Sequence, residues 1–122
     1  MSFWEELTAL LLEEGYDVVT NVSGDEKAVS GTTGIMIPYT QIMDFIEKAG
    51  AFIGLRSGLC DIISGADAKK IILYPAHVVE GISDHYYKFF GLRGLGLSDK
   101  DLHEMVINEN EHDKVREIAK LV

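Results

Sequence analysis

Two short apolar runs in the middle of the chain constrain the fold more than any other feature. They run from Ala51 to Leu55 and from Ile71 to Tyr74, and neither alternates apolar with polar residues. Runs of this kind and length are typical of strands covered on both faces, as in a parallel sheet. Parallel neighbours need a crossover connection, and residues 59–68 are long enough to form a short helix. The segment from Ala51 to Pro75 therefore predicts a strand, a tight polar turn, a helix and a second strand.

Helices and strands are also predicted on both sides of this unit. Ser2 and Glu5 match a capping box, and helical spacing of apolar residues predicts helices over about 3–14 and 39–49, each followed by a glycine. A β-branched run predicts a strand at 17–22, and residues 35–37 predict another. We expect the second helix to bury four residues: Ile42, Phe45, Ile46 and Ala49.

The C-terminal part of the chain is predicted to be helical. Ser98 is expected to cap a helix that carries Leu102, Met105 and Val106. A last helix follows, with four apolar residues at helical spacing: Val115, Ile118, Ala119 and Val122. The whole order predicts one α/β domain over 1–122, with C-terminal helices over about 98–122. It is a three-layer, Rossmann-like domain whose small parallel sheet has three or four strands. Such domains usually begin with a strand, so this one reads as incomplete.

Composition and charge exclude several classes of function. Eleven Lys and Arg residues against twenty Asp and Glu give a formal charge of −9, which repels polyanions, so we expect no nucleic-acid partner. The single cysteine excludes an internal disulfide, and no apolar run approaches the ~20 residues of a membrane helix. We therefore expect a cytoplasmic protein without a transmembrane segment. A small phosphorylated ligand remains compatible with the charge, because local donors can bind it.

The turn after the first apolar run is the best candidate for a binding site. Arg56 and Ser57 can donate hydrogen bonds, and the free N–H groups of Gly58, Leu59 and Cys60 would face a phosphate or diphosphate at the helix N-terminus. The alternative is that Arg56 pairs with a carboxylate and Ser57 only caps the helix. The pattern alone slightly favours that alternative.

Other chemistries find little support. Cys60 reads as a packed core residue, and Asp61 as a carboxylate that suits the helix dipole. Ser57 does not fit the Gly-x-Ser-x-Gly motif of a hydrolase nucleophile elbow, because it lies one position too far along the chain. The loop from Ser23 to Gly34 lacks the Gly-Lys-Ser/Thr sequence that ends a P-loop. The four histidines share no ligand spacing. We therefore expect no metal, no cofactor and no catalytic residue.

The central unit nevertheless resembles a known family. The residues from Ala51 to Ser64, followed by Lys69 to Pro75, look like the donor-binding half of GT-B fold glycosyltransferases, in particular the heptosyltransferase-like ones of bacteria. In that family a strand ends in Asp-Ser/Thr-Gly-x-x-His. Ser57 and Gly58 match this motif, whereas Arg56 stands at the aspartate place and Asp61 at the histidine place, which implies a variant subfamily. The glycine-rich stretch from Phe89 to Leu97 resembles a segment of bacterial surface-polysaccharide glycosyltransferase-like proteins.

The resemblance implies that this chain carries out only the donor-binding part of the enzyme's function. It implies that the turn holds the diphosphate of a nucleotide sugar, that Gly54 and Asp61 lie nearby, and that the loop with Gly24 and Thr33 lies near the base or ribose. The acceptor domain and the catalytic base of such enzymes would lie upstream of Met1, so we expect the isolated chain to be inactive. An alternative is a non-enzymatic, truncated α/β interaction module. It would form a homo-oligomer or pair with another chain, such as a missing N-terminal domain.

Overall fold

The computed structural model describes residues 2–55, 58–75, 101–107 and 113–122. The chain divides into two compact units, Met1–Pro38 with Glu109–Val122, and Tyr39–Asn108. The first unit contains α1 (Phe3–Glu13), β1 (Val19–Asn21), β2 (Thr33–Ile35) and α6 (Asp113–Leu121). The second contains α2 (Tyr39–Ala49), β3 (Ala51–Leu55), α3 (Gly58–Ile63), β4 (Lys69–Pro75) and β5 (Leu102–Ile107). Every strand pair among the described residues is parallel, so the prediction of an α/β fold with parallel strands is confirmed. The sequence predicted one small sheet of three or four strands, whereas the described strands form one sheet of two and one of three.

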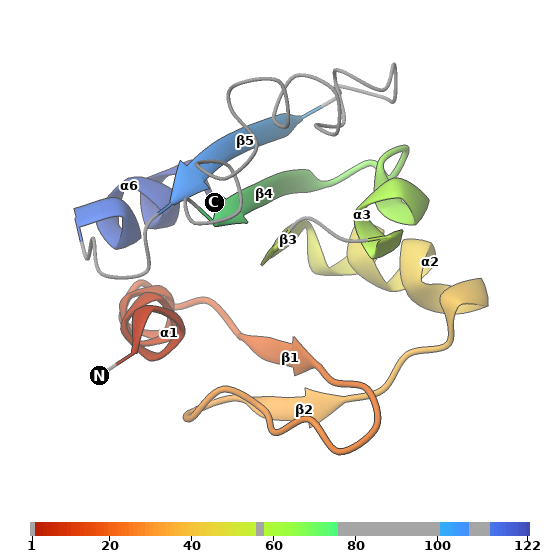
Figure 1. Cartoon of the computed structure of the whole chain (residues 1–122), viewed down its shortest axis with the longest axis horizontal. Coiled ribbons are helices and arrows are strands. Elements are labelled where there is room, and N and C mark those ends of the chain that lie inside the picture. Colours follow the sequence, from red (N-terminus) through yellow and green to blue (C-terminus); the bar gives the residue numbers. More distant parts are fainter. Residues whose placement is uncertain (1, 56–57, 76–100, 108–112) are drawn as a thin grey trace. The chain divides into compact units, whose positions relative to one another are not determined.

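The second unit is built on a three-stranded sheet in the order β3-β4-β5 (Figure 1). Ile71 of β4 pairs in register with Ile53 of β3 on one side and with His103 of β5 on the other. Because β4 is the central strand, its four residues from Ile71 to Tyr74 are fully buried. Its unbroken apolar run is explained by this cover on both faces. By contrast, β3 stands at the end of the strand order and is only partly buried.

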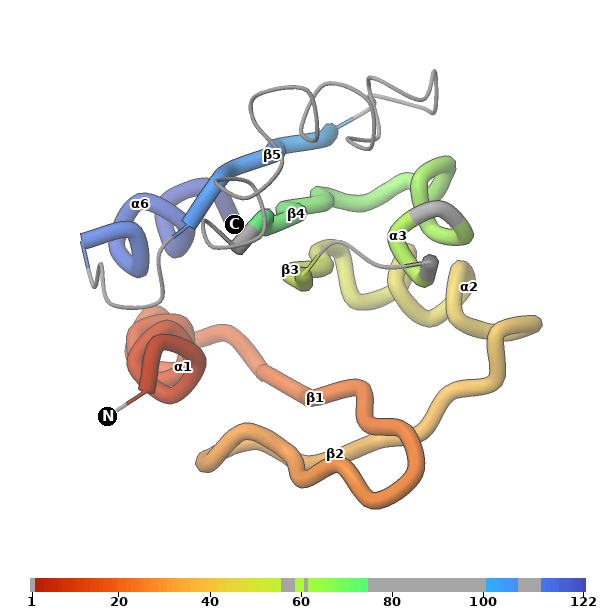
Figure 2. Tube along the Cα trace, in the orientation of Figure 1, coloured from red at the N-terminus to blue at the C-terminus, as the bar shows by residue number. Residues whose placement is uncertain are grey.

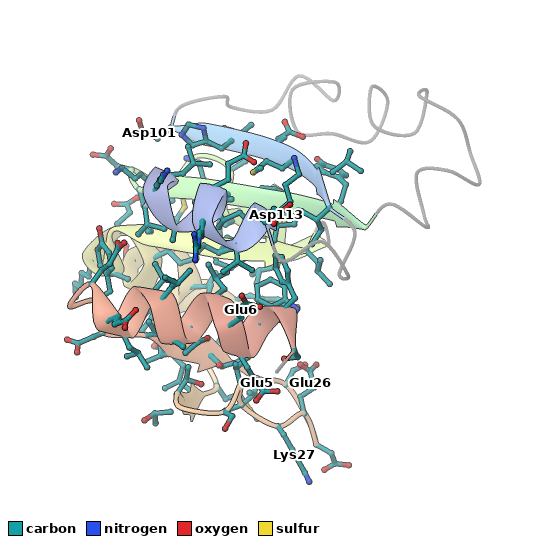
Figure 3. All side chains as sticks on the ribbon, turned by 90° about the vertical axis from the view of Figure 1, so that its left-hand side faces the viewer. Glu5, Glu6, Glu26, Lys27, Asp101 and Asp113 are labelled. Carbon is teal, nitrogen blue, oxygen red and sulfur yellow. The ribbon has the colours of Figure 1, made fainter. Side chains whose placement is uncertain are left out.

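The prediction of a helix through residues 102–107 is wrong, because these residues form the strand β5. The spacing of Leu102, Met105 and Val106 suits a helix, but pairing with β4 supplies backbone hydrogen bonds that outweigh so short a local signal. Asp101 precedes the strand with a left-handed φ of 49°, and its carbonyl accepts the N–H of Lys70 at 2.8 Å. Figure 3 shows Asp101 at the beginning of β5. This turn starts the pairing of β5 with β4.

The short crossover helix that the sequence predicted between the two apolar runs is present as α3. It ends at Ile63. Turn residues follow, with the Ala66 N–H bonded to the Ile63 carbonyl at 2.9 Å. The Lys70 amine donates to the Ala66 carbonyl at 2.6 Å, and this lysine is fully buried. A buried donor from β4 thus fixes the end of the crossover.

The prediction that four residues of α2 are buried is correct for two of them. Ile42 and Ile46 are buried as expected, but Phe45 is 37% exposed and Ala49 is exposed as well. The buried side of α2 is therefore narrower than the helical spacing predicted. Gly50 ends the helix with φ of 90°, a conformation that other residues adopt only with strain.

The first unit combines two helices with a two-stranded sheet. The Ser2 hydroxyl accepts the Glu5 N–H at 3.2 Å and so caps α1, in whose first turn Glu5 and Glu6 lie (Figure 3). α1 contacts α6, and their buried residues are Phe3, Leu7, Thr8 and Leu11 in α1, and Val115, Ile118 and Ala119 in α6. Strands β1 and β2 run side by side, joined by residues 22–32 (Figure 2). β2 begins two residues before the predicted strand at 35–37.

Across the described ranges, no helix is both long and apolar enough to cross a bilayer.

Candidate functional site

The parallel sheet of the second unit gathers three strand ends at one edge. β3 ends at Leu55, β4 at Pro75 and β5 at Ile107, and parallel pairing places these ends on the same side. We call this side the carboxyl edge. In α/β proteins ligands bind outside the carboxyl ends of parallel strands. The carboxyl edge is therefore where a binding site would be sought in this unit.

Three of the predicted diphosphate-binding residues, Gly58, Leu59 and Cys60, lie at the start of α3, next to the carboxyl edge. Arg56 and Ser57 lie outside the described residues, and so does the side chain of Asp61. Gly58 is the first residue of α3, and Leu59 is half-buried in its first turn. Only two residues separate the end of β3 from the start of α3, so the first amides of the helix follow the strand end directly.

Cys60 is held in the core, as the sequence predicted. It is 0% exposed and packs in one cluster with Ile72, Tyr74 and Leu102. Its Sγ donates to the Leu55 carbonyl at 3.4 Å, a weak hydrogen bond that joins the first turn of α3 to the last residue of β3. The part of Cys60 that remains relevant to a ligand is its backbone N–H.

Gly54 is required by packing inside β3. A Cβ at this position would lie 2.6 Å from Cζ and 2.9 Å from Cε1 of Phe52, which is far inside van der Waals contact. The ring of Phe52 therefore lies directly over the Gly54 backbone, and it packs against the cluster that contains Cys60. Gly54 was predicted to lie near a ligand. The packing of Phe52 against its backbone already accounts for a glycine at this position, one residue before the end of β3.

The two remaining predicted residues lie in the first unit. Gly24 follows the end of β1 by three residues and has φ of 58°, and Thr33 is the first residue of β2, paired with Val19. Thr33 thus stands at the amino end of a strand, whereas Gly24 lies beyond the carboxyl end of its neighbour. The hydroxyl of Thr20 in β1 lies 2.6 Å from the hydroxyl of Thr32, the residue before β2. The structure does not bring Gly24 and Thr33 together.

Two polar features of the sheet were not predicted from the sequence. One is the fully buried Lys70, and the other is a hydrogen bond from the Tyr74 hydroxyl to the Glu104 carboxylate. The position of Lys70 directly before the apolar run from Ile71 to Tyr74 was a sequence signal for its burial. The second could not be found without the β4–β5 register, in which Ile72 is opposite Glu104 and Tyr74 opposite Val106. Both features join neighbouring segments of the fold.

Within the described residues, no three His, Cys, Asp or Glu side chains are placed to hold a metal ion. What the carboxyl edge offers is a set of backbone amides at the start of α3, which can donate hydrogen bonds to an anion.

Comparison with protein-family models, with curated proteins and with solved structures finds no match to this chain.

Proposed function

We propose that the chain is the donor-binding part of a glycosyltransferase, with a three-layer, Rossmann-like fold that binds the diphosphate of a nucleotide sugar at its carboxyl edge. One observation carries the proposal. β3, α3 and β4 form a parallel strand-helix-strand unit in which the first helical residue, Gly58, follows the strand end after two residues. The sequence of this unit also resembles the donor half of GT-B fold enzymes.

The chemistry of the proposed site follows from its donors. Gly58 and Leu59 open α3, followed by Cys60 in the same first turn, and the first N–H groups of a helix have no acceptor one turn earlier. The proposal rests mainly on the N–H groups of Gly58 and Leu59. Arg56 and Ser57 add a guanidinium and a hydroxyl from the adjoining turn. Diphosphate oxygens are strong acceptors, and hydrogen bonds to charged groups are stronger than neutral ones. Local donors of this kind can bind an anion although the chain carries a formal charge of −9.

The site would bind a donor without transferring its sugar. The family resemblance assigns the catalytic base to a different domain. We therefore propose binding of a nucleotide sugar as the function of this chain, with a role in the synthesis of bacterial surface polysaccharide.

Isothermal titration calorimetry with UDP, GDP, ADP and CDP, and with their sugar conjugates, tests the proposal. We expect one nucleotide class to bind with a dissociation constant in the micromolar to millimolar range. The matched monophosphates should bind at least about tenfold more weakly, because they lack one charged group. Absence of binding by every nucleotide at millimolar concentration would overturn the proposal.

A matched pair of substitutions at Gly58 tests whether the backbone amide is the donor. Proline is accepted at the first position of a helix, where its missing N–H has no helical partner, so Gly58→Pro should keep the fold. Loss of a hydrogen bond to a charged group costs about 1.5–3 kcal/mol, so we expect affinity to fall about tenfold or more. Gly58→Ala keeps the N–H and serves as the control. Equal affinities of the two variants would exclude this amide.

A further inference from the structure

We draw no further inference here: the strongest candidate, the uncharged outer edge of the end strand β3 in the three-stranded sheet, carries none because nothing in the described part of the structure shows what covers it.

Discussion

Single residues of the sheet have roles that their types alone do not reveal. Lys70 is fully buried although lysine is usually exposed, and its neighbour Lys69 is exposed on the same strand. Side chains alternate between the two faces of a strand, so adjacent lysines face opposite sides. The Lys70 amine bonds to the Ala66 carbonyl, and its stem lies within the fold. We infer that the buried side chain of Lys70 stabilises the end of the crossover.

Substitutions of these two lysines should therefore have unequal effects on stability. Lys70→Ala removes buried atoms and a hydrogen bond, and we expect it to lower the free energy of unfolding by about 2–5 kcal/mol. Lys70→Met keeps most of the volume and should cost less than Lys70→Ala. Lys69→Ala should also cost less than Lys70→Ala, because the side chain of Lys69 is exposed. Urea denaturation monitored by circular dichroism measures all three. Equal costs for Lys69→Ala and Lys70→Ala would contradict the buried role.

A second prediction at this scale concerns Gly54. Gly54→Ala would place a methyl group against the Phe52 ring, and overpacking of this kind costs about 1–3 kcal/mol of unfolding free energy. Gly65→Ala is the control, because among the described residues a Cβ there meets only the Met43 methyl group, at 3.4 Å. Replacing Phe52 by leucine should reduce the cost of Gly54→Ala in the double variant. If that cost is unchanged, the ring is not the obstacle.

At the scale of elements, the strand β5 depends on its pairing with β4. The Tyr74 hydroxyl bonds to the Glu104 carboxylate across this pair, and Tyr74 is fully buried. The pairing also explains why residues 102–107 adopt a conformation that their apolar spacing did not predict. Side-chain and backbone bonds therefore act together to hold β5 in place.

A double-mutant cycle of Tyr74→Phe and Glu104→Gln measures this connection. We expect each single variant to lose stability, and a coupling free energy of about 0.5–3 kcal/mol between them, as found for residues in direct contact. His103 is exposed on the same strand, so Tyr74→Phe combined with His103→Ala should be additive. A coupling near zero for Tyr74 and Glu104 would show that the hydrogen bond does not stabilise the strand pair.

Elements with a strong local signal were predictable from the sequence, and elements that depend on distant partners were not. Helix α1 was located by its Ser2 cap and its apolar spacing, and β4 by an unbroken apolar run. β5 was missed because six residues with mixed spacing are decided by the strand beside them. Around the candidate site, the step from β3 to α3 followed from local pattern, whereas the hydrogen bond between Tyr74 and Glu104 needed the β4–β5 register.

For the whole molecule, the central claim is that the carboxyl edge of the β3-β4-β5 sheet binds a nucleoside diphosphate. The opposite edge, where Lys69 begins β4 and Leu102 begins β5, provides an internal reference. Parallel strands separate the two edges by the strand length, which for five to seven residues is about 16–23 Å at roughly 3.3 Å per residue. A bound ligand at one edge should therefore leave the backbone amides at the other nearly undisturbed.

The most direct measurement is an amide chemical-shift map of the uniformly ¹⁵N-labelled chain, titrated with UDP, GDP, ADP and CDP in turn. For the nucleotide that binds, we expect the largest shifts at Gly58, Leu59 and Cys60, smaller ones at Leu55, and almost none at Lys69 or Leu102. Saturable shifts centred on Lys69 and Leu102, or no shifts with any of the four nucleotides at millimolar concentration, would contradict a diphosphate site at the carboxyl edge.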